Sequence, residues 1–312
     1  MSTPTEEIPT EEMSPLRFCA KPTWWREGLD LSQSDVVRAE QVECEAFGKR
    51  FGKYAAVMAD GSDIVCARVS DVLRDAIGFG ESMMAWGVRE TLTYIRDRVR
   101  PWEQYSPSEL EEIFQNAETA RFRTRDEAAE YGTRAHELIE MWCHTGALQF
   151  TDSSGTWAID ITKESKEVQN AFGAFKRFWD KEGLQSVAIE QWLVDVERGY
   201  GGTIDFVARD KTGKLVLIDW KTSKAIRDKY LLQVGAYDWL WSVCGPGMVP
   251  GWEPISRAYI CRVDKVTAEY QLMPVFVNEA ERALLRDQWT CTLRTFRWLK
   301  NADKLIKKWA PK

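Results

Sequence analysis

The chain has 312 residues, of which 44% are hydrophobic and 29% charged, and its 42 basic and 48 acidic side chains give a net charge of −6. This is the composition of an ordinary globular protein, large enough for one large domain or two small ones. No apolar run approaches the ~18 residues that span a bilayer, and the acidic balance requires that any nucleic-acid-binding surface come from local clusters of positive charge.

The N-terminal residues and the cysteines indicate a cytoplasmic protein. Residues 1–15 contain four glutamates and no basic residue, which predicts a disordered acidic tail and excludes a secretory signal or transit peptide. The seven cysteines are scattered without a Cys-x-x-Cys pair. This spacing indicates reduced thiols and provides no clustered zinc or iron–sulfur ligands.

In chain order, the first predicted element is a β-hairpin over residues 53–69, around an Asp-Gly turn. From about 70 to 145 the pattern is helical. Ser106-Pro-Ser108 should start one helix, and the capping box Thr124-Arg-Asp-Glu127 should start another that ends before Gly146. We therefore expect residues 16–120 to form a mostly helical N-terminal region, an arch or lid, and residues 121–312 to form the core.

The second half of the chain alternates strands with helices. An amphipathic helix is expected over 162–182, followed by strands at 185–197, 202–210 and 214–221, a helix at about 228–243 that stops at Gly245-Pro-Gly247, strands near 256–263 and 267–276, and a last helix after Asn278. This order predicts an α/β fold with a central mixed β-sheet flanked by helices.

One predicted hairpin, residues 201–224, contains charged side chains among apolar ones. Its three-residue loop should place Gly213 in the left-handed conformation. If the residues that flank the loop pair with each other, Asp205 lies opposite Asp219. Lys221 then shares the face of Asp219, because side chains alternate along a strand.

Two carboxylates that face each other repel and lose solvation, at a cost of several kcal/mol for each buried ion. A divalent cation offsets this cost, and carboxylate oxygens suit Mg²⁺ or Mn²⁺. A lysine beside such a cation can stabilise the charge that develops when a phosphodiester is cleaved. The pattern therefore favours a phosphodiester-cleaving site, and a buried Asp–Lys ion pair is the alternative that it leaves open.

Two more polar side chains stand in unusual places. Glu190 lies mid-strand between apolar neighbours, and His136, one of only two histidines, shares a helix face with Gly132 and Glu140 at intervals of four residues. Each has an ordinary alternative, since Glu190 could be an exposed strand residue and His136 a packed or surface histidine.

These motifs together resemble the PD-(D/E)XK nuclease superfamily in its RecB-like exonuclease branch, which includes the phage-type and mitochondrial genome maintenance exonucleases. Each motif is weak alone, but all five follow the order of that branch between residues 124 and about 276: Gly132…His136…Glu140, Glu190, Gly202-Thr-Ile-Asp205, Asp219-Trp220-Lys221 and Gln233…Tyr237. The resemblance implies a restriction-endonuclease-like core.

The resemblance also implies roles for these residues. His136, Asp205 and Asp219, with the backbone carbonyl of Trp220, would hold one or two Mg²⁺ or Mn²⁺ ions. Lys221 would position or activate the attacking water, and Glu190 would orient water or a second ion. The residues that would support the site or bind DNA are Gln233, Tyr237 and Glu140.

Two cofactors of related proteins are not expected. An iron–sulfur cluster needs a tight group of cysteines, whereas Cys244, Cys261 and Cys291 are far apart. The chain also lacks the phosphate-binding loop of a helicase, so no nucleotide cofactor is expected.

Arg121, Arg123 and Arg125 precede the helical His136 and could contact phosphates; a solvated helix face is the alternative. We expect a deoxyribonuclease that shortens linear DNA from its ends in recombination, repair or phage replication. It would act in the cytoplasm of a bacterial or phage-infected cell, away from membranes, with a recombinase or single-strand-binding protein as a candidate partner. The alternatives are a structure-specific endonuclease and a catalytically silent DNA-binding module.

Overall fold

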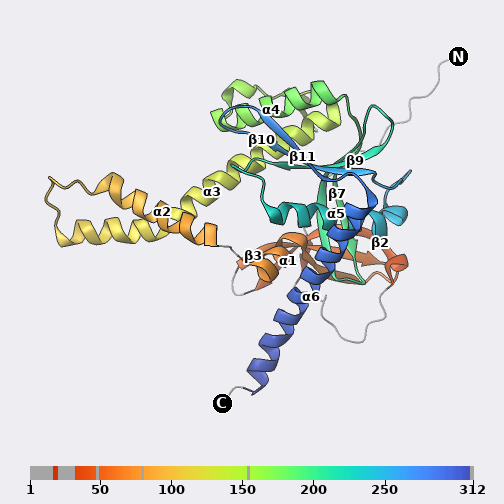
Figure 1. Ribbon diagram of the computed structural model, residues 1–312, viewed down its shortest axis with the longest axis horizontal. Coiled ribbons are helices and arrows are strands. Elements are labelled where there is room, and N and C mark those ends of the chain that lie inside the picture. The colour runs from red at the N-terminus through yellow and green to blue at the C-terminus, as the bar shows by residue number, and fades with distance from the viewer. Residues whose placement is uncertain (1–16, 20–31, 47–48, 79–80, 153–154, 310–312) are drawn as a thin grey trace. The chain divides into compact units, whose positions relative to one another are not determined.

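The computed structural model describes residues 17–19, 32–46, 49–78, 81–152 and 155–309. The chain divides into two compact units (Figure 1), one formed by Met1–Arg68 with Val194–Gly202 and the other by Val69–Leu193 with Thr203–Lys312. This division falls at residue 68, and the boundary expected at residue 121 stays a prediction. The acidic tail expected over residues 1–15 lies outside the described residues.

The first unit consists mainly of strands: β1 (Arg17–Cys19), β2 (Val36–Ala46), β3 (Lys49–Met58) and β4 (Asp63–Arg68), with a short 3-10 helix, η1 (Gln33–Asp35). β1 is parallel to β2, whereas β2–β3 and β3–β4 are antiparallel. The hairpin expected over 53–69 is confirmed. Among the described residues, the helical region expected over 16–120 begins only at residue 69. The residues before it mainly form strands, and β2 shows the alternation of polar and apolar side chains that is typical of a strand.

The second unit is built on a mixed β-sheet, which confirms the predicted α/β class. Its strands are β7 (Gln185–Asp195), β8 (Tyr200–Arg209), β9 (Leu215–Lys221), β10 (Arg257–Val263) and β11 (Tyr270–Phe276). β8–β9 and β10–β11 are antiparallel, β9–β10 is parallel, and β7 pairs with β8.

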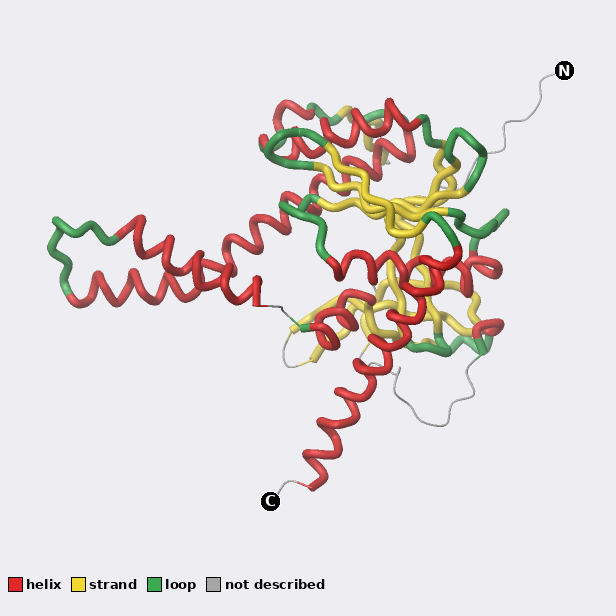
Figure 2. Tube along the Cα trace, viewed as in Figure 1, coloured by secondary structure: helices red, strands yellow, loops and turns green. Residues whose placement is uncertain are grey.

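Helices lie on both faces of this sheet (Figures 1 and 2). The helices of this unit are α1 (Val69–Ile77), α2 (Glu81–Arg98), α3 (Pro107–Thr145), α4 (Lys166–Glu182), α5 (Asp228–Met248) and α6 (Glu279–Trp309); a 3-10 turn, η2 (Ile161–Lys163), and a small hairpin, β5 (Gln149–Asp152) with β6 (Gly155–Ala158), lie between α3 and α4. Among the described residues, no helix is long and apolar enough to cross a membrane.

The core on one side of the sheet is aromatic. Phe175 and Phe178 of α4 pack edge-on against Trp220 of β9, with ring centroids 5.4 and 5.5 Å apart. Val216 and Ile218 lie in the same cluster, as the alternation along β9 predicts. Burying each of these large side chains contributes roughly 1.5–3 kcal/mol, so β9 is firmly held where it carries charged residues on its other face.

The long helix α3 departs from the expectation of two helices. Ser106 caps its N-terminus in a capping box with Glu109, and Gly146 ends it in the left-handed conformation, as predicted. Thr124, however, lies inside the helix, where its hydroxyl donates to the carbonyl of Ala120. The first half of α3 runs beside α2 as a helical hairpin that projects from the sheet (Figure 1). The packing of α3 against α2 keeps the chain helical through Thr124–Glu127, a sequence that could also start a new helix.

Helix α5 is also longer than expected. It continues through Gly245 and Pro246 to Met248, instead of stopping at about residue 243. Pro246 has no N–H to donate to the carbonyl of residue 242, so the last turn of α5 has one backbone hydrogen bond fewer than a regular helix. Gly245 packs directly against the Trp252 ring, so closely that a Cβ there would overlap it.

Candidate active site

The hairpin of β8 and β9 has the register that the sequence predicts. Gly213 is left-handed at φ 78°, and Phe206 pairs with Ile218, which continues the ladder toward Asp205 opposite Asp219. The Trp220 amide donates a hydrogen bond of 2.9 Å to Asp205 Oδ2. The backbone of β9 therefore orients the Asp205 carboxylate.

Asp219 and Lys221 form an ion pair in the same place. Lys221 Nζ lies 2.5 Å from Asp219 Oδ2, and the Asp219 side chain is fully buried. Burial raises the pKa of Asp219 to about 6, although Lys221 opposes the shift. Asp219 Oδ1 has no hydrogen-bond partner among the described residues. A buried carboxylate oxygen without a partner is costly, and a cation would satisfy it.

Lys221 itself remains a cation. Burial alone lowers the pKa of its ammonium, but Asp219 and Asp205 outweigh burial, and the net pKa lies above its ordinary value. The ammonium also lies 5.2 Å from the centre of the Tyr230 ring. Lys221 can therefore donate to an anionic group.

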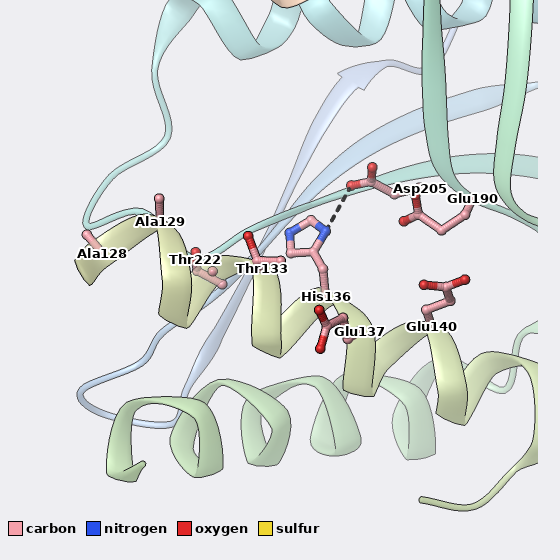
Figure 3. Close-up of a pocket in the computed structure, with 10 residues that line it drawn as sticks. Ala128, Ala129, Thr133, His136, Glu137, Glu140, Glu190, Asp205 and Thr222 are labelled. Carbon is pink, nitrogen blue, oxygen red and sulfur yellow. Dashed lines mark ion pairs between the residues drawn. The ribbon is translucent and has the colours of Figure 1, made fainter. Parts of the chain in front are cut away.

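His136 reaches this hairpin from α3. Its Nδ1 lies 3.9 Å from Asp205 Oδ2 (Figure 3). Burial, together with Lys221, lowers the pKa of His136 to about 4. The imidazole is therefore neutral at neutral pH, which is the form that coordinates a metal ion.

Glu190 of β7 has an unusual backbone and an unusual carboxyl. Its φ is 47°, in the left-handed region that side chains other than glycine rarely adopt, at a cost of roughly 1–3 kcal/mol. Burial, together with the nearby carboxylates of Asp205, Glu140 and Asp219, raises its pKa to about 9. Four carboxyl groups thus compete for one region, which favours either protonation or a bound cation.

His136, Glu190 and Asp205 line a cavity of about 460 Å³ (Figure 3), whereas the Asp219–Lys221 pair is not part of its lining. Ligand atoms of His136, Glu190 and Asp205 all lie within 4.8 Å of one another. Two carboxylates and a neutral imidazole are suitable donors for a divalent ion such as Mg²⁺ or Mn²⁺. The residues present therefore fit a metal ion.

Glu140, half-buried, lines the same cavity, and its carboxyl lies 3.9 Å from His144. Sequence reasoning missed Thr133, Glu137 and Thr222, which also line it. For Thr222 the available signal was its place directly after Lys221, at the end of β9.

Gln233 and Tyr237 of α5 form a hydrogen bond with each other and do not line the cavity. Gln233 Nε2 donates to the Tyr237 hydroxyl at 2.8 Å, and neither residue lines the cavity. Their predicted role in holding the site or DNA stays a prediction.

The three arginines are exposed on the first half of α3. Arg123 bonds Thr119 and the Asn116 carbonyl of its own helix, and Arg121 and Arg125 lie over the Phe122 ring. They lie N-terminal to Ala128 and Ala129, which line the cavity.

Comparison with known proteins identifies the family. The PD-(D/E)XK nuclease superfamily matches residues 104–304, well over half of the chain, and the chain belongs to this superfamily. No curated protein matches the chain.

Two solved structures are similar in part. The crystal structure of SSO0001 is 13% identical at a TM-score of 0.28, covering 70% of this chain and 86% of that one. A candidate exonuclease from Eubacterium rectale is 12% identical at a TM-score of 0.29, covering 74% and 81%. Likeness at these TM-scores adds nothing to the family assignment.

Proposed function

We propose that the chain is a metal-dependent DNA exonuclease of the RecB-like branch. The observation that carries the proposal is the cluster of His136, Glu190 and Asp205, within 4.8 Å of one another, beside the buried Asp219–Lys221 pair. Membership of the superfamily supports nuclease chemistry. A purely structural ion pair would not explain why a histidine and a strained glutamate converge on the same carboxylates.

Each of these residues would have its own role in cleavage. Asp205, Asp219 and His136, with the Trp220 carbonyl, would hold Mg²⁺ or Mn²⁺. When bound, such an ion polarises a phosphodiester and lowers the pKa of a water molecule. Lys221, kept protonated by the carboxylates around it, would donate to the reacting phosphate oxygens and offset their growing charge.

Glu190 would act next to Asp205 and His136. Once a cation offsets the surrounding negative charge, its raised pKa falls and its carboxylate can accept a proton from water. Glu140, which lies farther along α3 and also lines the cavity, would add a further negative charge. The exposed Arg121, Arg123 and Arg125 would contact phosphates of the DNA that enters.

Attack from strand ends is favoured over internal cutting by the resemblance of the motifs to the RecB-like branch and by the projecting hairpin of α2 and α3. A structure-specific endonuclease on the same fold remains the second candidate. We also keep the predictions that the protein has no iron–sulfur cluster and no nucleotide cofactor, acts in recombination, repair or phage replication, and works with a recombinase or single-strand-binding protein.

The test uses end-labelled linear and closed circular DNA, single- and double-stranded, with Mg²⁺, Mn²⁺ or EDTA. We expect metal-dependent shortening of linear DNA, no cutting of circles, and loss of the shortening in Lys221→Ala. Cutting of circles would favour the endonuclease. Absence of cleavage with DNA still bound would favour the silent binding module.

A further inference from the structure

The last turns of α6 present a surface that the proposed active site does not use. The earlier part of α6 is anchored, since Trp289, Leu293 and Phe296 are buried and Lys300 Nζ lies 2.7 Å from Asp75 Oδ2 of α1. Beyond Lys300, the described side chains of α6 are exposed, apart from the partly exposed Ala302. This end of the helix therefore extends past the core that stabilises it.

Large apolar side chains occupy one face of this end. Trp298 is 66% exposed, Leu305 58% and Trp309 78%. At i, i+7 and i+11 these three lie within about 40° of one another around the helix, and the two indoles are ~16 Å apart along its axis. Exposed indoles in a row are uncommon on a protein surface unless they bind something.

Positive charge surrounds this face. Residues 294–312 contain seven lysines and arginines and one acid, in a chain with a net charge of −6. Arg294 and Lys308 are exposed, and Lys308 Nζ lies 5.7 Å from the centre of the Trp309 ring. Indoles among cations are complementary to nucleobases joined by phosphates.

We propose that the C-terminal end of α6 binds single-stranded nucleic acid outside the active site. Trp298 and Trp309 stack on bases, and Arg294 and Lys308 contact phosphates. The ligand class rests on the proposed function. A protein partner fits less well, because interface cores are depleted of charge, and this face carries a cation beside each indole.

The test measures the anisotropy of a fluorescein-labelled single-stranded oligonucleotide in EDTA, so that cleavage does not interfere. Trp298→Ala/Trp309→Ala should raise Kd about 30-fold or more, because stacking is lost at two bases. Trp298→Phe/Trp309→Phe, which keeps aromatic rings, should restore most of the affinity. Arg294→Gln/Lys308→Gln should flatten the slope of log Kd against log salt by about 1.4.

Two controls separate this surface from the active site. Trp157→Ala removes an indole that is 54% exposed in the small hairpin and should leave Kd unchanged. Hydrolysis of bis(4-nitrophenyl) phosphate, too small to reach α6, should be equal in wild type and Trp298→Ala/Trp309→Ala.

Unchanged DNA affinity in Trp298→Ala/Trp309→Ala would overturn the proposal. If Trp298→Ala/Trp309→Ala binds DNA like wild type but no longer self-associates in light scattering, the face would be assigned to a second copy of the chain. If it binds DNA like wild type but no longer binds phosphatidylserine vesicles, the face would be assigned to a membrane surface. Either result would overturn the proposal. Failure of the proposed function appears separately, as wild-type protein that cleaves no DNA with any metal.

Discussion

Gly132 of α3 lies directly against Thr222 at the end of β9: a Cβ on Gly132 would stand 3.0 Å from Thr222 Oγ1. His136 lies one helical turn farther along α3, and Lys221 precedes Thr222 on the strand. This close approach therefore sets the position of the histidine relative to the carboxylates. The missing side chain of Gly132 is what permits the 3.9 Å separation of His136 and Asp205.

Gly132→Ala should push α3 away from β9 by a few tenths of an ångström. Because catalytic geometry is sensitive to shifts of that order, we expect DNA cleavage to fall about tenfold or more with little loss of stability. Steady-state kinetics and thermal melting measure the two effects.

Gly173→Ala is the matched control, since a Cβ at that helical glycine meets nothing within 4 Å; it should leave cleavage unchanged. Gly132→Ala/Thr222→Ala should regain part of the activity by removing the clashing hydroxyl. Wild-type activity in Gly132→Ala alone would show that the approach does not control the site.

Lys221 should contribute to stability as well as to cleavage. Lys221→Met leaves the buried Asp219 carboxylate without its partner, and breaking a buried pair from one side costs roughly 3–5 kcal/mol. We expect the free energy of unfolding in EDTA, from urea titration, to fall by about that amount. Added Mn²⁺ should recover part of the loss.

Asp219→Asn/Lys221→Met provides the comparison, because it removes both charges. It should be more stable in EDTA than Lys221→Met and equally inactive. Equal stability of wild type and Lys221→Met would mean that the 2.5 Å pair adds nothing to the fold.

Glu190 should make the metal-free protein less stable as pH rises. Its pKa is about 9 in the folded chain against an ordinary 4.5, so the folded state holds a proton that the unfolded state releases across this interval. Stability therefore falls between these two pH values. Glu190→Gln should remove this dependence and melt at a higher temperature than wild type near pH 8 in EDTA.

Glu253→Gln, on an exposed carboxyl, should melt with the wild-type pH profile. With Mn²⁺ present, wild type should melt at a higher temperature than Glu190→Gln, because only wild type has the carboxylate at residue 190 that the ion favours. A flat profile for wild type in EDTA would contradict the raised pKa.

The sequence predicts the hairpin of the site well because its signals are local. A glycine at the left-handed turn position and alternation on both sides fix the register that brings Asp205 toward Asp219. The meeting of His136 with this hairpin required the family resemblance, because His136 precedes Asp205 by 69 residues in the chain. The left-handed backbone of Glu190 had no local signal at all.

The errors have the same physical origin. The pattern that begins at Thr124 can start a helix or lie inside one, and only the contact of α2 with α3 decides between them. In the first unit, strands β2 and β3 pair through their backbones, and their alternating polar residues give a weaker pattern than the helices that follow. Tertiary contacts settle both cases, and local propensity does not.

Asp238 of α5 should be essential for joining α5 to α6. It is 1% exposed, and its Oδ2 accepts from Arg286 at 2.8 Å and lies 3.4 Å from Arg282 Nε. Asp238→Ala leaves two partly buried guanidinium groups without their shared carboxylate. We therefore expect a loss of roughly 3–5 kcal/mol in urea unfolding, with cleavage by the remaining folded protein unchanged.

The matched comparison is Glu253→Ala, which breaks the pair with Arg209 at 2.6 Å. Glu253 is exposed and Arg209 partly exposed, so the free energy of unfolding should fall far less than in Asp238→Ala. Arg282→Met/Asp238→Leu/Arg286→Met, which replaces all three charges by apolar groups, should recover most of the stability lost in Asp238→Ala. If Asp238→Ala unfolds like wild type, packing of Trp289 and Leu293 alone holds α6 in place.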